Sequence, residues 1–136
     1  MSRETDLAWC AGFFDGEGHV SYHRHYPSLI SGRVTGGMRC NVPQCSDNIE
    51  VLHEFQRIVG LGKLKGPYKT AKRDRHLLTF GTKEVEPLFL LLKPYLKREK
   101  TLAFQNALMR YWSHDPSPTP ADYDRLRKKR RKKEIT

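Results

Sequence analysis

The sequence predicts an α+β fold in which a four-stranded antiparallel sheet carries its helices on one face. Apolar residues recur at helical spacing in four segments, and two pairs of short alternating segments each follow a helix. The alternation leaves one side of these strands polar and basic, as in an antiparallel sheet with one open face. The 136 residues are enough for one domain with its own core.

The first half of the chain is predicted to fold as a helix followed by a hairpin. Thr5 or Asp6 can cap a helix that ends near "DGEG" at 15–18. Residues 19–26 and 33–42 then alternate between polar and apolar side chains, which indicates two strands. Gly36 and Gly37 interrupt the second strand, and we expect a bulge there.

The second half repeats this order and adds helices. Ser46 or Asp47 can cap a helix that Gly60 ends, and strands are expected over 63–69 and 75–80. Two further helices are expected over 84–96 and 99–112. We therefore expect a folded domain over 1–115, followed by a proline-containing linker and a basic tail over 116–136.

The formal net charge of +10 is spread over the whole chain. Residues 119–136 hold eight basic and three acidic residues, and residues 1–118 hold 17 basic and 12 acidic ones. The body is therefore basic without its tail, which favours a polyanionic partner. The face of the sheet that is predicted to be open holds no acid, and its candidate nucleic-acid contacts are His19, Ser21, His23, His25, Arg33, Thr35, Arg39, Asn41, Lys63, Lys65, Lys69 and Arg75.

Several other classes of protein are disfavoured. No apolar stretch approaches the ~20 residues of a membrane span, and the N-terminus does not resemble a signal peptide. Three cysteines do not make a disulfide framework, and the Cys40–Cys45 pair has no second pair for a zinc site. No Ser/His/Asp arrangement stands out. We expect a soluble intracellular protein without a membrane partner or a small-molecule substrate.

The stretch "WCAGFFDGEGHV" at 9–20 ends the first helix with small residues and two acids. Ala8, Gly12 and Gly16 recur every four residues and so lie on one side of the helix, where a second helix could approach closely. Asp15 and Glu17 lie at the negative end of the helix dipole. Two such helices side by side would gather four carboxylates, and Mg²⁺ takes hard oxygen ligands of this kind.

The nine residues "CAGFFDGEG" at 10–18 closely resemble the signature of the LAGLIDADG homing endonucleases. The order of elements over roughly 5–112 is similar to the αββαββα core of that family. Two positions depart from the usual signature, because Cys10 replaces its leading leucine and Glu17 its metal-binding aspartate. The resemblance implies a saddle of antiparallel strands along duplex DNA, with paired signature helices at the centre.

The resemblance also implies roles for individual residues. Glu17, helped by the carbonyl of Gly16, would hold a divalent metal, Mg²⁺ by preference, with Mn²⁺ or Ca²⁺ able to substitute in binding. Gln44, with Asn48 nearby, would organise active-site water. Lys100 would activate that water or stabilise the phosphate, although Lys97 remains an alternative. The dimer interface implied by the paired helices comprises Ala8, Ala11, Gly12 and Asp15, with Asp15 also tying down the helix end.

A single signature per chain implies a homodimer on a pseudo-palindromic site. We expect a metal-dependent, site-specific double-stranded DNA endonuclease that leaves 3′ overhangs. It would work in the cytoplasm of a bacterium or phage-infected cell, or in an organelle. Two alternatives remain open at this point: an RNA-binding intron maturase, and a catalytically silent DNA-binding regulator on the same scaffold.

Overall fold

A computed structural model describes residues 2–24 and 36–113 of the chain. His25, Arg33, Thr35 and the tail from residue 114 lie outside the described residues. The elements follow the predicted αββαββα order and end with a further helix: α1 (Arg3–Glu17), β1 (His19–Arg24), β2 (Gly36–Cys45), a 3₁₀ turn (Ser46–Asn48), α2 (Ile49–Val59), β3 (Lys63–Tyr68), β4 (Arg75–Phe80), α3 (Thr82–Leu92) and α4 (Arg98–Trp112).

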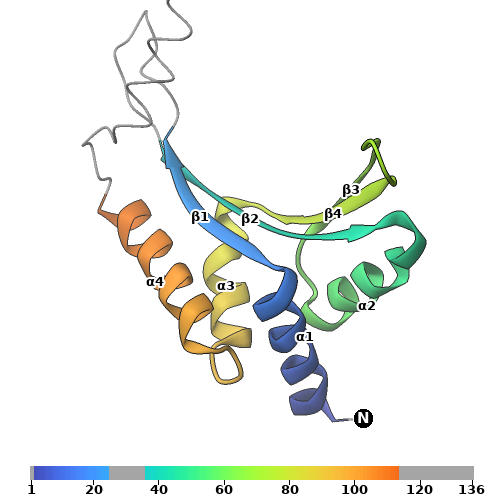
Figure 1. The fold of residues 1–136 in the computed structure, drawn as a ribbon. Coiled ribbons are helices and arrows are strands. Elements are labelled where there is room, and N and C mark those ends of the chain that lie inside the picture. The colour runs from blue at the N-terminus through green and yellow to red at the C-terminus, as the bar shows by residue number, and fades with distance from the viewer. Residues whose placement is uncertain (1, 25–35, 114–136) are drawn as a thin grey trace, which may run out of the picture.

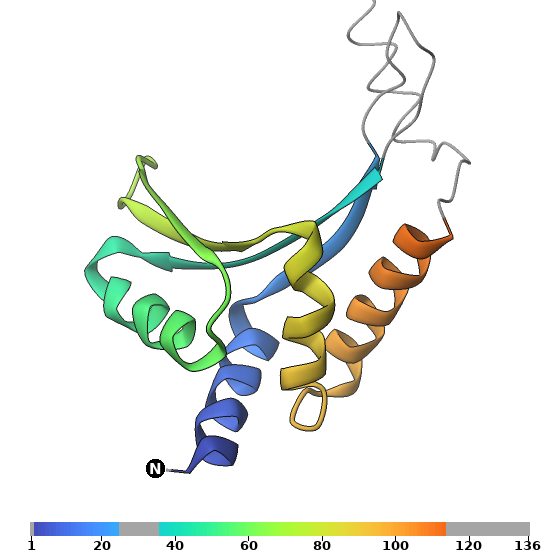
Figure 2. The ribbon, with the colours of Figure 1, turned by 180° about the vertical axis from the view of Figure 1, so that it is seen from behind.

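The four strands form one antiparallel sheet in the order β1-β2-β4-β3. The sheet curves like a saddle, and the four α-helices all lie against its convex side (Figures 1 and 2). None of the described elements covers the concave side, called the open face below. The predicted fold class is confirmed.

The core lies between the sheet and the helices because every second strand residue points toward them. Val20, Met38, Cys40, Val42 and Leu78 are buried on this side. Apolar residues at helical spacing meet them from below, so the two periodicities read from the sequence converge on one core. The largest fully buried helix side chains are Phe14, Phe55, Phe104, Leu52, Leu88 and Leu92.

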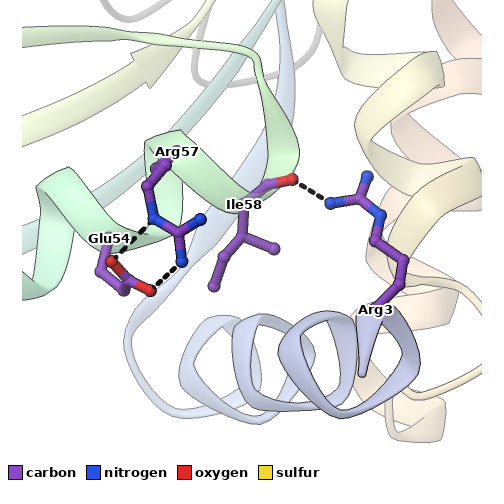
Figure 3. A network of polar contacts seen from close by, with 4 residues as sticks. All are labelled: Arg3, Glu54, Arg57 and Ile58. Carbon is purple, nitrogen blue, oxygen red and sulfur yellow. Dashed lines mark hydrogen bonds and ion pairs between the residues drawn. The ribbon is translucent and has the colours of Figure 1, made fainter. Parts of the chain in front are cut away.

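Aromatic contacts and polar contacts fix α1 among the other helices. The ring of Phe104 lies 5.1 Å from Phe14 and 5.0 Å from Phe89, so this trio joins α1, α3 and α4. At its other end, α1 is held to α2 because the Arg3 guanidinium donates a hydrogen bond to the carbonyl of Ile58 (Figure 3). Glu54 and Arg57 form an exposed ion pair beside this contact.

The structure corrects two local predictions. The cap of α1 is Ser2, not Thr5 or Asp6, because the Ser2 hydroxyl accepts a hydrogen bond from the backbone N–H of Thr5. Gly36 and Gly37 pair regularly with β1, and the irregularity lies instead between Lys65 and Tyr68 in β3. At Gly36 a Cβ atom would lie 2.1 Å from the Tyr22 hydroxyl, so a larger residue there would require the Tyr22 ring to shift.

Element boundaries also differ by a few residues. β4 has the predicted bounds, whereas α3 begins at Thr82 and ends at Leu92 rather than covering 84–96. Ser46 begins a 3₁₀ turn before α2, and Gly60 ends α2 in the left-handed conformation at φ 68°. Across residues 2–24 and 36–113, no helix has the length and apolar character of a membrane span.

Candidate active site and nucleic-acid interface

The signature helix runs almost directly into the first strand of the sheet. α1 ends at Glu17, Gly18 follows, and β1 begins at His19. A Cβ atom on Gly18 would lie 2.4 Å from the ring of Phe14, so the buried ring leaves room there for glycine alone. The exposed Glu17 side chain is thereby held at the junction between the helix layer and the sheet.

Asp15 ties the end of α1 to the start of α4. Its two carboxylate oxygens accept hydrogen bonds from the backbone N–H of Lys97, over 3.2 and 3.1 Å. Lys97 is the capping residue of α4, where free N–H groups and the positive end of the helix dipole favour an anion. Half-buried Asp15 thus has a structural partner within its own chain.

Lys100 reaches the same junction from the first turns of α4. Its side-chain amine donates a hydrogen bond to the carbonyl of Gly18 over 2.7 Å. This contact places a cation one residue along the chain from Glu17. Of the two lysines that the sequence left open, Lys97 meets the signature through its backbone and Lys100 through its side chain.

Gln44 lies in the part of β2 that extends past the start of β1, since His19 pairs with Asn41. Its side chain is half-buried, and its carbonyl oxygen accepts a hydrogen bond from the backbone N–H of Cys45. The amide –NH₂ group is the part of this side chain that remains to orient a ligand. Asn48 is exposed in the 3₁₀ turn.

The oxygen atoms at the end of α1 suit a hard divalent cation. Glu17 offers an exposed carboxylate, and the last carbonyls of a helix, here including that of Gly16, have no partner N–H within the helix. Carboxylate and carbonyl oxygens are ligands that Mg²⁺ and Ca²⁺ accept. Over the described ranges, no group of three His, Cys, Asp or Glu side chains is placed to hold a metal ion.

The open face carries most of the described DNA contacts that the sequence predicts. His19 and Ser21 lie on this side of β1, where their side chains are 3.1 Å apart. Strand register then groups the open-face residues into cross-strand rows. One row joins Ser21 and Arg39, the next is His19–Asn41–Thr79–Lys63, and a third is Pro43–Leu77–Lys65.

The remaining predicted contacts lie around these rows. His23 pairs with Gly37 toward one end of the sheet, and Arg75 pairs with Tyr68 toward the other. Lys69 is exposed just after β3. The described cations of the face, Arg39, Lys63, Lys65, Lys69 and Arg75, are all exposed.

Several open-face residues were not predicted from the sequence, among them Pro43 and three that line a hollow. Tyr68, Leu77 and Thr79 help to line a hollow on this face together with Arg39, Asn41 and Lys65. The alternation in "RHLLTF" was a usable signal, because it places Leu77 and Thr79 on the same side as Arg75. Tyr68 could not be placed in this way, since the irregularity after Lys65 breaks the alternation of β3.

The small-residue stripe of α1 is open to solvent in the single chain. Ala8, Gly12 and Gly16 are exposed, and a Cβ atom on either glycine would meet nothing within 4 Å. No contact within the described chain therefore requires glycine at these two positions. Ala11 differs, because it is fully buried in the core and presents no surface to a second chain. It is removed from the predicted interface.

The three cysteines are free thiols, of which Cys10 and Cys40 are buried and Cys45 is half-buried. Burial, aided by the nearby Asp6 carboxylate, raises the pKa of the Cys10 thiol to about 12. Burial also holds the pKa of Cys40 far above its usual range, with a smaller contribution from Glu84. Cys10, the signature position that departs from leucine, thus serves as a small apolar side chain in the core.

Comparison with known proteins identifies the fold. No family model matches the chain, and no curated protein matches it. Among solved structures, the chain is similar to the homing endonuclease I-CvuI in complex with the I-CreI target in the presence of magnesium, with the DNA not cleaved. The TM-score is 0.67 and the identity 18%, and the match covers 89% of this chain and 74% of I-CvuI.

Two further similarities have the same character. The group I intron-encoded homing endonuclease I-CeuI, complexed with DNA, matches 82% of this chain and 56% of its own, with a TM-score of 0.64 and 19% identity. The LAGLIDADG homing endonuclease I-SmaMI, bound to cleaved DNA, matches 89% of this chain and 41% of its own, with a TM-score of 0.63 and 15% identity. The chain thus has the LAGLIDADG homing endonuclease fold, as its signature predicted.

Proposed function

We propose that this protein is a site-specific, metal-dependent endonuclease for double-stranded DNA that acts as a homodimer. The observation that carries the proposal is the junction of α1 and β1. There the exposed Glu17 carboxylate lies at the end of the signature helix, and the Lys100 side chain bonds the carbonyl of Gly18. The adjoining open face bears cations and polar side chains for a nucleic acid.

The open face supports duplex binding through two kinds of contact. Exposed lysines at its β3 edge suit the phosphate backbone, and contacts of that kind fix the position of a protein on DNA. Arg39, Asn41 and Thr79 are suited to the hydrogen-bonding edges of bases in the major groove. I-CvuI, I-CeuI and I-SmaMI are each described as bound to DNA, which supports the same partner here.

The site residues suit the hydrolysis of a phosphodiester. Glu17 and the Gly16 carbonyl would hold a divalent cation, Mg²⁺ by preference and Mn²⁺ or Ca²⁺ as substitutes in binding. Such an ion, when bound, supplies Lewis-acid stabilisation of phosphate oxygens. Lys100 would place a positive charge where negative charge develops on the phosphate, and the Gln44 amide would orient the attacking water.

A homodimer is proposed because one chain carries one signature and cutting a duplex requires two sites. The exposed stripe of Ala8, Gly12 and Gly16 leaves room for a second copy of α1 to pack closely. Two-fold packing would align two open faces along one pseudo-palindromic target and set the two Glu17 side chains near each other. Cleavage would then leave 3′ overhangs. A protein acting on genomic DNA works inside the cell, in a bacterium, a phage-infected cell or an organelle.

Cleavage of a randomised duplex library with Mg²⁺ tests the proposal, with the cut ends sequenced. The wild-type chain should cut one long, near-palindromic sequence and leave uniform 3′ overhangs. Glu17→Gln should abolish cutting while duplex binding persists, whereas Glu50→Gln, at an exposed acid of α2, should cut like the wild type. Selective duplex binding without cutting would indicate a silent regulator, and preference for structured RNA would indicate a maturase.

A further inference from the structure

Leu77 is an apolar side chain on a mostly polar face. It lies on the open side of β4, together with Arg75 and Thr79. Leu78 and Phe80 occupy the alternate positions of the strand and are buried on the helix side. It is half-buried, yet it is not among the apolar side chains that pack against the core in the described part of the chain. Its partial burial therefore comes from neighbours on the open face.

Strand register gives Leu77 one apolar and one cationic neighbour. It pairs with Pro43 of β2 on one side and with Lys65 of β3 on the other. Side chains in directly paired positions are about 4.5–5.5 Å apart at Cβ, so Leu77 and Pro43 form one apolar surface. Leu77 and Lys65 also line the same hollow, where a bound duplex would remove them from water.

The chemistry of a base edge limits what such a surface can recognise. Among the groups that the four base pairs present in the major groove, the C5-methyl of thymine is the apolar one, and the others donate or accept hydrogen bonds. Placing Leu77 against a hydrogen-bond donor or acceptor of a base would remove that group from water without giving it a new partner, which is unfavourable. A thymine methyl is the ligand that fits.

We propose that Leu77, supported by Pro43, is a specificity-determining residue that contacts the 5-methyl group of a thymine in each half-site. The proposal rests on the proposed DNA-binding function of the open face. Same-face residues along a strand are about 6.8 Å apart, close to the rise of two base pairs. The thymine therefore lies about two base pairs from the position read by the Asn41–Thr79 row.

The test uses the full-length chain and the duplex recovered by the library selection. Each thymine of the half-site is replaced singly by deoxyuridine, which lacks only the methyl group, and binding is measured by competition in Ca²⁺. One position should weaken binding about four-fold, the effect of losing one buried methyl-sized group. Leu77→Ala should bind thymine and deoxyuridine there equally, while Leu77→Met should keep the preference.

Thr79→Ala is the matched control, because it alters the next residue on the same side of β4 and leaves Leu77 in place. It should retain the preference for thymine at that position. Three results would each overturn the assignment. The wild-type chain could bind every deoxyuridine duplex as tightly as the thymine duplex, the recovered site could lack thymine, or the methyl preference could survive Leu77→Ala. If the library yields no selected duplex, the proposed DNA function itself fails, and the two failures are thus distinguished.

Discussion

The side-chain amine of Lys100 donates a hydrogen bond to the backbone carbonyl of Gly18 over 2.7 Å, joining α4 to the end of the signature helix. The two residues are far apart in sequence, and no spacing rule relates them. Their contact fixes a positive charge beside Glu17, at the start of the open face.

Replacing Lys100 tests whether this charge serves cleavage. Lys100→Met should lower the rate of DNA cutting by about 10²- to 10³-fold, the range seen when one group that stabilises transition-state charge is removed. Affinity for the recovered duplex should change little. Lys97→Met is the control, because Lys97 holds Asp15 through its backbone N–H and should cut normally. Equal loss of cutting in both variants would contradict the role given to Lys100.

Gly12 tests the proposed packing of two α1 helices. Gly12→Leu should leave each chain folded, since a Cβ atom there meets nothing within 4 Å in the single chain. It should abolish the dimer, as measured by sedimentation, and with it the cutting of both strands. Gly18→Ala provides the contrast, because its Cβ would overlap the Phe14 ring and should lower the melting temperature of the chain itself. A Gly12→Leu dimer of normal affinity would move the interface elsewhere.

Asp15 tests the contact between α1 and α4. Asp15→Ala should lower the free energy of unfolding by about 1 kcal/mol, because the N–H of Lys97 loses its acceptor at the start of α4. Urea denaturation measures this difference, and Asp15→Asn should recover part of it by keeping one acceptor oxygen. Asp47→Ala, an exposed residue without a capping hydrogen bond in the 3₁₀ turn, should change stability less.

Thiol reactivity tests the burial of the cysteines. At pH 8 the raised pKa of Cys10, about 12, leaves about one thiol in ten thousand ionised, so iodoacetamide should modify half-buried Cys45 first. Cys10 and Cys40 should react only after unfolding. The folded state should also lose stability as pH rises from 9.0 toward about 12, since the unfolded Cys10 thiol ionises first. Rapid labelling of native Cys10, seen by mass spectrometry, would contradict its burial.

Arg39 tests base recognition by hydrogen bonds. If it bonds a guanine, Arg39→Ala should cost about 1–3 kcal/mol of binding and relax the preference at one base pair. That base pair should lie about four positions from the thymine assigned to Leu77, because the Arg39 row and the Pro43 row are two same-face steps apart on β2. Lys83→Ala, on the helix side, should leave all preferences intact. A uniform loss of affinity would instead assign Arg39 to the phosphate backbone.

Periodicity predicted the architecture because each element has one buried side. The alternation in β2 separated core residues from open-face residues, and the bounds of β4 were predicted correctly. Helix starts were less certain, since Ser2, Thr5 and Asp6 are all good caps and only the fold shows that the Ser2 hydroxyl accepts the bond. The glycines of β2 were misread as a bulge, because the close approach of Tyr22 to Gly36 comes from another strand and is not visible in the sequence.

The residues of the candidate site could be predicted within the contiguous signature. They could not be predicted where segments distant in sequence meet. Glu17 and Asp15 were found from nine contiguous residues, but their separate environments became visible only once α4 was in place. Ala11 was assigned to the interface that the resemblance implies, yet it is buried in the core. Leu77 was overlooked because an apolar residue in a strand is ordinarily part of the core, and here it is not.

Alternate residues of each strand face opposite sides of the sheet. One set of side chains therefore packs against the helices, and the other set lies on the open face. Val20, Met38, Val42 and Phe80 carry stability on the helix side. The open-face set contributes little to the core and can be exchanged at small cost in stability. If the open face binds DNA as proposed, a lineage built on this sheet is free to drift from one DNA target to another while its scaffold stays the same, and an engineer could retarget it by the same route.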